Sequence, residues 1–333
     1  MVLVTLSSGK SFQASSGSAI LDSATQSQVS LPYSCKTGRC STCKCKVVSG
    51  ETKVLVAELG LTDAEKFDGW ILSCARTAIT DVVLEVEELR DVVIPVAKTQ
   101  ACRIGRLEKL APDVIKVVLR LPPNVALDFI PGQYIDVIGP GGIRRSYSLA
   151  NAPKADNTLE LHIRAVENGA MSQYWFNQSA VNDLLRLNGP QGTFFLRDIA
   201  KCDLIFLATG TGIAPVKAML EALPSFPADQ QPRSVTVLWG ARCERDLYFD
   251  IASLPGIQRY LPVLSRAEAT WEGEQGYVQD ALLRQISDLR NAVVYACGSD
   301  LMIHSAKSML TAAGLPSQHF YSDAFVCSGT LAQ

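Results

Sequence analysis

Four cysteines near the amino terminus constrain this chain more than any other feature of its sequence. They follow the spacing C-x4-C-x2-C-x30-C, at Cys35, Cys40, Cys43 and Cys74. A cluster of two irons and two sulfides is held by four thiolates, and this spacing is typical of its ligands. Gly38, inside the loop, can adopt backbone conformations that other residues resist. The pattern therefore predicts a [2Fe–2S] site in the first part of the chain.

The same loop has a second interpretation, a structural zinc site. Such sites more often contain paired C-x2-4-C knuckles, and only Cys40 and Cys43 form such a pair here. The [2Fe–2S] interpretation is therefore favoured. Cys45 falls outside the pattern and is interpreted as a bystander, and the cysteines scattered beyond residue 100 as small buried side chains.

Composition and charge narrow the function classes. The chain has 333 residues and a formal net charge of −2, which gives no indication of a nucleic-acid stripe or a membrane-binding face. No apolar run approaches about 18 residues, so no membrane span is expected, and the N-terminal stretch lacks the features of a signal peptide. We therefore expect a cytoplasmic monomer of two or three domains that binds no nucleic acid.

Changes in composition and in the spacing of apolar residues divide the chain into three predicted domains. Residues 1–92 combine short strands and helices, including a helix at 20–26 and another that starts at the capping box of Thr62 and Glu65. Residues 93–99, which contain a proline, are interpreted as a linker. The cysteine loop lies inside the first of these domains.

The other two domains differ in the period of their apolar residues. Residues 100–198 contain short strands between turn signals, which indicates an antiparallel β-barrel. Strands are expected there at 115–121, 134–138, 159–164 and 194–196. Residues 199–333 alternate apolar strands with helices, which is typical of a doubly wound parallel sheet. The expected strands are 204–208, 235–239, 260–264 and 293–296, and the expected helices include 214–223 and 301–313.

A short run in the middle domain, Arg144–Ser148, suits a flavin nucleotide. Arg145 can pair with a phosphate, Tyr147 can stack on the isoalloxazine ring, and the hydroxyl of Ser148 can hydrogen-bond the flavin. Ser146 belongs to the same run. By itself the run could also be an ordinary strand end, so its position between the other two domains carries much of the argument.

Three further glycine-containing turns are candidate sites for binding a nucleotide. Gly169–Ser172 precedes a helix expected at 172–177 and would present free amides to a pyrophosphate. Gly210–Pro215 follows a strand and starts a helix, although a proline stands where a dinucleotide fingerprint has its third glycine. Cys297–Gly298 follows another strand end, which is expected to face the same crevice. Cys297 has the alternative interpretation of a small buried residue.

In this order, the motifs resemble the ferredoxin–NADP⁺ reductase superfamily with an N-terminal plant-type ferredoxin domain. The resemblance spans nearly the whole chain and is carried by the cysteine loop, Pro131–Tyr134, Arg145–Ser148, Gly169–Ser172, Gly210–Pro215 and Cys297–Gly298. It implies a β-grasp-like ferredoxin domain, an FAD-binding barrel and an NAD(P)-binding domain that ends in a flavin-facing aromatic residue.

Within that superfamily, several runs resemble the CDP-6-deoxy-Δ3,4-glucoseen reductases, which supply electrons to a pyridoxamine-phosphate dehydrase in 3,6-dideoxyhexose synthesis. The runs are Gly132–Asp136, Arg144–Ser148, Asn188–Phe195, Tyr295–Ser299 and Phe320–Phe325. The segment Cys43–Val47 looks more like the reductase components of bacterial aromatic-ring mono- and dioxygenases. Both kinds of electron acceptor stay open at this point.

The resemblance also implies roles for individual residues. Those that would bind FAD are Arg145, Ser146, Tyr147, Ser148, Gly169, Met171 and Ser172. Those that would bind the nicotinamide nucleotide are Gly210, Thr211, Gly212, Pro215, Cys297, Gly298 and Met302, with Arg242, Ser265, Arg266 and Tyr277 near its adenosine half. Phe325 would cover the second flavin face, so Tyr147, Cys297 and Phe325 are the catalytic candidates that border the reacting rings.

These motifs together predict an electron-transfer flavoenzyme that uses a [2Fe–2S] cluster, FAD and NADH or NADPH. A nicotinamide delivers two electrons as hydride, the cluster accepts one at a time, and a flavin can do both. No side chain need act as a general acid or base, and the three histidines are interpreted as surface or capping residues. A zinc-stabilised nucleotide-binding module is the alternative of another class, but it leaves the flavin motifs unexplained.

Two finer expectations concern the nicotinamide. NADH is favoured because Glu268, Glu272 and Glu274 make the neighbourhood acidic, although Arg242 and Arg266 could meet the 2′-phosphate of NADPH. Since the nicotinamide must stack on the flavin, we expect the C-terminal segment to shift when it binds.

Overall fold

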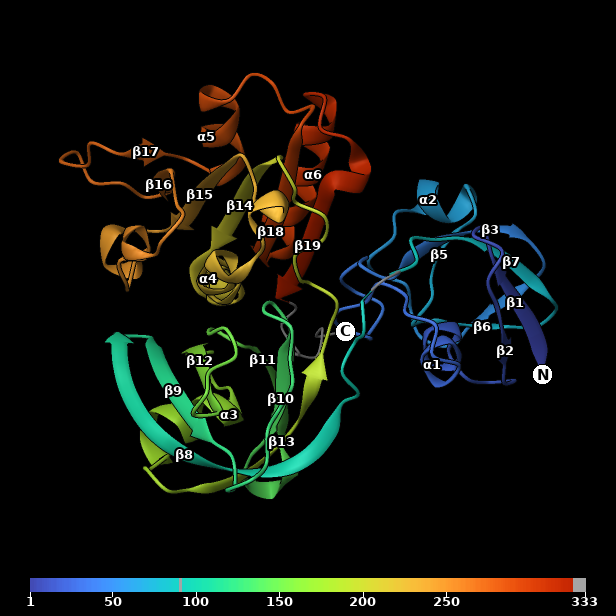
Figure 1. Cartoon of the computed structure of the whole chain (residues 1–333), viewed down its shortest axis with the longest axis horizontal. Coiled ribbons are helices and arrows are strands. Elements are labelled where there is room, and N and C mark those ends of the chain that lie inside the picture. Colours follow the sequence, from blue (N-terminus) through green and yellow to red (C-terminus); the bar gives the residue numbers. More distant parts are fainter. Residues whose placement is uncertain (90–91, 326–333) are drawn as a thin grey trace. The chain divides into compact units, whose positions relative to one another are not determined.

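The computed structural model describes residues 1–89 and 92–325. The chain forms two compact units that divide between Ile94 and Pro95, the second of which runs to Phe325 (Figure 1). The C-terminal segment that is expected to shift, together with Cys327, lies outside the described residues. Across the described part of the chain, no helix is both long enough and apolar enough to cross a membrane.

The first unit is built on a five-stranded sheet with the order β2-β1-β7-β3-β5. Its strands are β1 (Val2–Leu6), β2 (Ser11–Ala14), β3 (Lys44–Ser49), β5 (Trp70–Leu72) and β7 (Val82–Glu85). The helix α1 (Ile20–Gln26) packs Ile20, Leu21 and Ala24 into the core of this unit. A parallel pair, β1 with β7, lies between antiparallel pairs, which gives the predicted β-grasp-like arrangement.

Two smaller elements complete the first unit. The strands β4 (Thr52–Val54) and β6 (Arg76–Ala78) form a separate antiparallel pair. The helix α2 (Asp63–Phe67) begins at the predicted capping box: the Glu65 amide donates to Thr62 Oγ1 at 3.2 Å, and the Thr62 amide donates to Glu65 Oε2 at 2.9 Å. The helices predicted at 20–26 and after Thr62 are both present.

The second unit begins with an antiparallel sheet of order β11-β10-β13-β8-β9-β12. Its strands are β8 (Lys98–Ala111), β9 (Val114–Arg120), β10 (Tyr134–Ile138), β11 (Arg144–Ser148), β12 (Thr158–Arg164) and β13 (Leu184–Gln191). A bridge between Leu149 and Leu161 brings the two edge strands together. The barrel is thereby closed, as its short strands predicted.

The structure corrects two local expectations for the barrel. Phe194–Leu196 are not a strand; Phe194 instead packs on Tyr295 of the next domain, with ring centroids 5.7 Å apart. The sheet instead contains β13, which was not predicted because polar and glycine residues interrupt its apolar pattern. β8 starts at Lys98, inside the stretch 93–99 that was expected to be linker.

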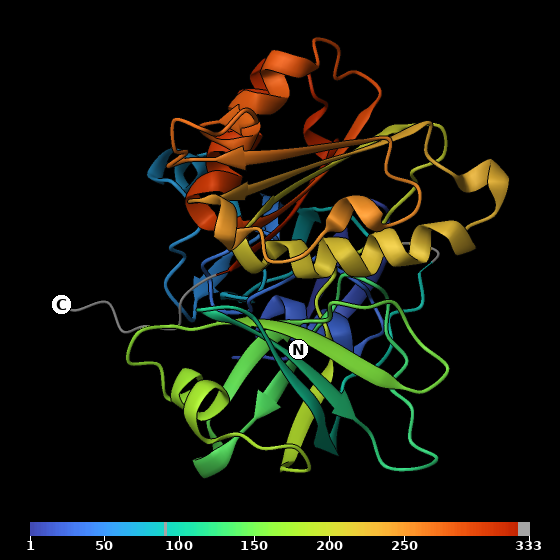
Figure 2. The same ribbon diagram turned by 90° about the vertical axis from the view of Figure 1, so that its left-hand side faces the viewer.

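The rest of the second unit is a six-stranded parallel sheet with the order β17-β16-β15-β14-β18-β19. Its strands are β14 (Asp203–Thr209), β15 (Ser234–Ala241), β16 (Arg259–Leu264), β17 (Glu274–Gln275), β18 (Ala292–Ser299) and β19 (Phe320–Phe325). The helix α4 (Ile213–Ala222) lies on one face, and α5 (Val278–Gln285) and α6 (Asp300–Ala312), which contact each other, lie on the other (Figure 2). The predicted doubly wound sheet is therefore confirmed.

Short helical turns join these elements. They are α3 (Ala170–Gln173), a following π-helical turn η2 (Tyr174–Gln178), and the 3-10 turns η1 (Pro140–Gly142), η3 (Gly210–Gly212), η4 (Leu223–Ser225), η5 (Ala228–Gln230), η6 (Glu244–Asp246), η7 (Ile251–Ser253) and η8 (Ser317–His319). The sheet order reverses between β14 and β18, so η3 stands at the switch point where ligands of such folds bind.

The barrel has a hydrophobic core of its own, and it also contributes residues to the core of the parallel sheet. Ala111 and Val114 of the barrel belong to the same buried cluster as Phe206 and Tyr295 of the sheet. Tyr147 of the flavin motif packs on the barrel's own core, whereas Ile213, directly after η3, lies in the shared cluster. Both belong to the same compact unit.

Candidate functional site

The four cysteines of the predicted cluster site come together as two pairs. The Cys35 amide donates to Cys40 Sγ at 3.4 Å, and the Cys43 thiol donates to Cys74 Sγ at 3.2 Å. Two irons that each take two protein thiolates require two such pairs. The donor set therefore fits a [2Fe–2S] cluster.

Within each cysteine pair, the hydrogen bond favours the thiolate on one partner and the thiol on the other. The hydrogen bond to Cys35, together with burial, raises the pKa of Cys40, and the hydrogen bond to Cys74, together with burial, raises the pKa of Cys43. The hydrogen bond from Cys40 lowers the pKa of Cys35 to about 5, although burial opposes this shift. In the second pair, the hydrogen bond from Cys43 likewise lowers the pKa of Cys74. Cys45 lies fully buried in the core, where burial raises the pKa of its thiol to about 12. Only thiolates ligate iron, so Cys35 and Cys74 are the thiols that most readily lose their protons, while Cys40, Cys43 and Cys45 hold theirs more tightly.

The backbone of the cysteine loop is tightly constrained. Gly38 has a φ of 75°, and a Cβ on it would lie 2.4 Å from the Ala57 carbonyl oxygen. Its own carbonyl accepts from the Gly60 amide at 2.9 Å, and the Ser41 hydroxyl donates to the Gly60 carbonyl. The segment 57–60 therefore fixes the loop from outside, and glycine is required where the two segments meet.

A buried ion pair that sequence reasoning missed lies behind the loop. Glu58 accepts hydrogen bonds from the Leu72 amide at 2.7 Å and from Arg76 Nε at 2.9 Å. Arg76 also donates to Thr52 Oγ1 at 3.1 Å. These contacts hold the strands on both sides of Cys74. Their only sequence signal was an arginine two residues after a ligand.

The flavin motif forms β11. Ser146 Oγ donates to Asp136 Oδ1 at 2.6 Å, and the Tyr147 hydroxyl accepts from Trp175 Nε1 at 3.0 Å. Burial raises the pKa of Tyr147 to about 12, so its hydroxyl stays protonated. Arg145 is exposed and Ser148 is buried. The strand thus offers a fixed aromatic ring beside an accessible guanidinium, which suits a flavin and its phosphate.

The glycine turn after the barrel differs locally from its prediction. The helix begins at Ala170 rather than Ser172 and continues as the π-helical turn η2. Ser172 Oγ accepts from the Val166 amide at 2.8 Å, and Met171 is buried. Ser172 therefore organises its own loop, and its contact with a pyrophosphate stays a prediction.

The two strand-end motifs of the parallel sheet lie in contact, as expected from the topology. A Cβ on Gly212 would lie 2.2 Å from the Cys297 carbonyl oxygen, and the Ser299 amide donates to Thr209 Oγ1 at 3.2 Å. Cys297 itself is fully buried, and burial raises the pKa of its thiol well above the ordinary value. A protonated, enclosed thiol can shape the site by packing but cannot reach solvent as a nucleophile.

The residues expected near adenosine also gather at one edge of this sheet. The Arg266 amide donates to the Arg242 carbonyl at 2.8 Å, and Ser265 Oγ donates to the Ala241 carbonyl at 3.3 Å. Tyr277 follows β17 and is 65% exposed. The Arg242 guanidinium pairs with Asp246 at 3.3 Å and with Asp113 at 3.7 Å. Its positive charge is therefore largely compensated within the chain.

Arg164, at the end of β12, was not singled out by the sequence. A Cβ on Gly210 would lie 2.8 Å from its Nη1, and its Nε lies 3.2 Å from Asp113 Oδ2. Its buried Nη2 has no hydrogen-bond partner among the described residues. The barrel thus contributes a guanidinium to the nucleotide turn η3.

His162 overturns the expectation that the histidines are surface or capping residues. Its side chain is buried between Glu160, at 2.9 Å from Nε2, and Tyr248, at 3.2 Å from Nδ1. Burial lowers the pKa of His162. The lone histidine in a strand gave no signal of this, because its partner Tyr248 comes from another domain.

Three family models match the chain in the order of its domains. A 2Fe-2S iron-sulfur cluster binding domain matches residues 4–78, an oxidoreductase FAD-binding domain matches 101–196, and an oxidoreductase NAD-binding domain matches 206–308. Binding of a [2Fe–2S] cluster, FAD and a nicotinamide nucleotide follows from these matches, and the cysteine pairs and strand ends described above fit those groups.

Comparison with whole proteins agrees. A CDP-6-deoxy-L-threo-D-glycero-4-hexulose-3-dehydrase reductase of Yersinia pestis is 41% identical over 96% of this chain and 97% of that protein. The ferredoxin–NAD(P)⁺ reductase component of a naphthalene 1,2-dioxygenase/salicylate 5-hydroxylase system of Ralstonia sp. is 30% identical over 95% of this chain and 96% of its own length. The crystal structure of an Amycolatopsis cytochrome P450 reductase superimposes with a TM-score of 0.75 at 27% identity, over 98% of this chain and 99% of that one.

Proposed function

We propose that the electron acceptor of this chain is a 3-dehydrase of a CDP-6-deoxyhexulose. The proposal starts from the family: the chain belongs to the NAD(P)H-dependent iron–sulfur flavoprotein reductases. One observation carries the choice of acceptor. The identity to the dehydrase reductase is 41%, against 30% to the oxygenase reductase component, at nearly equal coverage.

The cofactors supply the electron chemistry when bound: the nicotinamide gives a hydride to FAD, and the cluster passes the electrons on singly. The chain's own residues hold and orient these groups. Cys35, Cys40, Cys43 and Cys74 would ligate the cluster. The FAD would be held by Arg145, Ser146, Tyr147, Ser148, Gly169, Met171 and Ser172. The support is the combination of the exposed Arg145 with the Tyr147 ring fixed by Trp175.

The nicotinamide nucleotide would bind across η3 and the end of β18. Thr211 and Cys297 would border its ring, with Cys297 acting by packing because its thiol is enclosed. Phe325, at the end of β19 and 38% exposed, would cover the flavin until the nicotinamide replaces it. Gly210, Gly212, Pro215, Gly298 and Met302 would complete this half of the site.

We favour NADH over NADPH as the hydride donor. The Arg242 charge is engaged by Asp113 and Asp246, which leaves less of it for a 2′-phosphate. Glu272 and Glu274 line a cavity of about 550 Å³ beside β16, where Arg284 pairs with Glu274 at 2.7 Å. Because Glu274 is paired with Arg284, Glu272 is the carboxylate whose charge would repel a dianionic phosphate nearby. Steady-state kcat/KM should therefore be higher for NADH than for NADPH.

The second candidate acceptor is an aromatic-ring oxygenase. Cys43–Val47 resembles the reductases of such systems, and the Ralstonia relative covers the chain from end to end. The cluster would pass the electrons to the acceptor, so residues beside the cysteine loop would lie near the acceptor protein. A resemblance in Cys43–Val47 therefore supports an oxygenase as acceptor more than a resemblance in another segment would.

A reconstituted assay tests the choice. The purified holoprotein and NADH are mixed under anaerobic conditions with a CDP-6-deoxyhexulose 3-dehydrase and its CDP sugar, and product is measured against NADH consumed. Stoichiometric product that requires all components supports the proposal. NADH consumption coupled to an oxygenase component and its aromatic substrate in air, with none coupled to the dehydrase, would establish the second candidate instead.

A further inference from the structure

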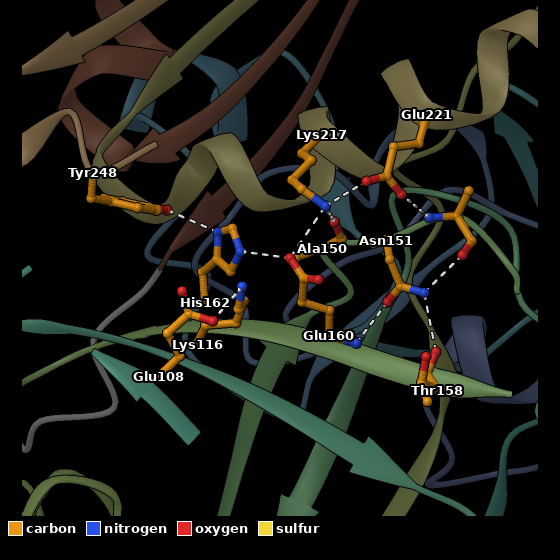
Figure 3. Close-up of polar contacts among 11 residues, drawn as sticks. Glu108, Lys116, Ala150, Asn151, Thr158, Glu160, His162, Lys217, Glu221 and Tyr248 are labelled. Carbon is orange, nitrogen blue, oxygen red and sulfur yellow. Dashed lines mark hydrogen bonds and ion pairs between the residues drawn. The ribbon is translucent and has the colours of Figure 1, made fainter. Parts of the chain in front are cut away.

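A group of partly buried polar side chains joins the FAD barrel to the NAD-binding domain, and none of the roles above uses it. Figure 3 shows Lys217 and Glu221 of α4 meeting Glu160 of β12 and the main chain that follows the flavin strand. We call Lys217, Glu221, Glu160 and the Ala150 carbonyl the interdomain clamp. All four lie within the second unit.

Lys217 is the centre of the clamp. Its ammonium donates to the Ala150 carbonyl at 2.9 Å and lies 2.5 Å from Glu221 Oε1 and 3.2 Å from Glu160 Oε1. The Lys217 side chain is 13% exposed and that of Glu160 14%. Three acceptors around one largely buried ammonium fix its position, because a charged group in such a site is costly without its partners.

The clamp grips the main chain as well as side chains. Glu221 Oε2 accepts from the Ala152 amide at 3.0 Å. Asn151, between the two gripped residues, is fully buried and accepts from the Glu160 amide at 2.6 Å. The segment 150–152 is thus held by α4 from one side and by β12 from the other.

A second branch leads from Glu160 to the nucleotide turn. Glu160 as a carboxylate only accepts, so His162 Nε2 donates to it and His162 Nδ1 accepts from the Tyr248 hydroxyl. The Tyr248 ring packs edge-on against Trp239 at 5.1 Å between centroids. Trp239 Nε1 donates to the Gly210 carbonyl at 2.9 Å. The branch therefore ends on η3.

Both ends of this network adjoin the reacting groups. Ala150 comes two residues after Ser148, the last residue of the flavin strand, and Lys217 lies five residues after Gly212 of the nucleotide turn. The clamp consequently connects the strand that would hold FAD to the helix that begins at the nicotinamide site. Hydride transfer depends steeply on the relative position of donor and acceptor.

We infer that Lys217 is a positioning residue that sets the geometry between the flavin and the nicotinamide. Its ammonium is engaged by groups of the chain itself, the Ala150 carbonyl, Glu221 and Glu160. It acts through the Ala150 carbonyl and α4, so its loss should affect the rate of hydride transfer within the bound complex more than the binding of NADH. The inference uses the reductase activity alone and holds whichever protein accepts the electrons.

The main test is anaerobic stopped-flow reduction of the flavin by NADH in Lys217→Met. The limiting rate at saturating NADH should fall about tenfold or more, with a smaller change in the apparent dissociation constant of NADH. Lys217→Arg, which keeps the charge and donors, should recover much of the rate. Lys116→Met is the matched control: it removes a half-buried ion pair to Glu108 at 2.8 Å that lies wholly inside the barrel.

A second measurement, which does not depend on enzyme turnover, accompanies the stopped-flow test. Hydrogen–deuterium exchange of peptides that cover residues 149–153 should be faster in Lys217→Met and in Glu221→Gln. Lys217→Met removes the ammonium that orders the Glu221 carboxylate, and the single amide oxygen of the glutamine in Glu221→Gln cannot accept from both Lys217 and the Ala152 amide. Glu221→Gln preserves shape, so it remains informative if Lys217→Met loses FAD. The inference would be overturned if the limiting rate stayed within twofold of the parent in both Lys217→Met and Glu221→Gln. If Lys217→Met has lost FAD, a rate within twofold in Glu221→Gln alone would overturn it. So would an equal loss of rate in Lys116→Met.

Discussion

At the scale of single residues, the space around the cysteine loop decides which side chains are possible. Gly38 combines a left-handed backbone with a neighbouring carbonyl that a Cβ would strike, whereas Gly9, with a φ of 89°, has open space around it. Both glycines have a positive φ, but they differ in the free space that a Cβ would have. They therefore separate conformational strain from steric exclusion.

The expected result is that Gly38→Ala loses most of its cluster and Gly9→Ala retains it. Gly9→Ala should cost about 1 kcal/mol of stability, because only the backbone preference is violated. Gly38→Ala must in addition displace the Ala57 carbonyl from the loop. Iron and acid-labile sulfide per chain measure the outcome, and equal cluster content in both variants would refute the steric argument.

His162 provides a pH prediction at the same scale. Burial lowers its pKa below the ordinary value of 6.5, so the unfolded chain binds a proton that the folded chain excludes. The stability that the neutral imidazole provides is complete above about pH 6.5 and is lost as the pH falls towards the folded pKa, by at most about 1.4 kcal/mol per pH unit.

The Tm should therefore decrease between pH 7 and pH 5.5, and His162→Phe should flatten this slope. His304→Gln, which removes an exposed histidine that contacts its own helix, is the control for loss of an imidazole. The slope rather than the absolute Tm is the readout, since the phenylalanine also removes two hydrogen bonds. A slope that is unchanged in His162→Phe would contradict the assignment.

At the scale of elements, the cluster loop depends on how β4, β5 and β6 are held together. Glu58 accepts hydrogen bonds from the Leu72 amide of β5 and from Arg76 of β6, so it ties these two strands together. Its side chain is 3% exposed. Removing one partner of a buried pair leaves an uncompensated charge and typically costs about 3–5 kcal/mol. An exposed pair costs far less, about 0–1 kcal/mol.

We therefore expect Glu58→Ala to lower the temperature at which the cluster absorbance is lost, by much more than Lys66→Ala does. Lys66 pairs with the fully exposed Asp63 at 3.4 Å in the same unit and is the matched control. Both variants are followed by the visible absorbance during heating under anaerobic conditions. Equal shifts would show that the Glu58–Arg76 pair does not secure the loop.

At the scale of the whole molecule, the two units divide the electron path. The first holds the cysteine pairs, and the second holds the FAD and NAD-binding domains. Since hydride transfer needs only the second unit, damage to a cluster ligand should leave the first half-reaction intact. The two activities can then be measured separately in one protein.

Cys43→Ser should retain NADH-dependent reduction of ferricyanide, which can take electrons from the flavin, and lose most reduction of cytochrome c, which relies on the cluster. Cys45→Ser, two residues away and buried in the core, should retain both activities and the iron content. If Cys43→Ser lost flavin reduction by NADH as well, the two units could not be independent in function.

The sequence alone determined the chemistry and the order of the domains. Ligand spacing is local, so C-x4-C-x2-C could be read without a fold. Apolar periods located four of the six strands of the parallel sheet, and three of those four to within two residues at both ends. The edge strands β17 and β19 were not predicted. The glycine turns of this sheet follow from the same local geometry. These features depend on neighbours in the chain, which is why they were predictable.

Only the tertiary structure decided how the polar side chains are partnered. β13 escaped notice because its pairing with β8 and β10 is set by distant strands, and Phe194 left the expected strand to fill a core shared by two domains. His162, Lys217 and Glu58 look like ordinary polar residues until partners from other elements enclose them. Burial and partner choice are long-range properties, and no local pattern in the chain encodes them.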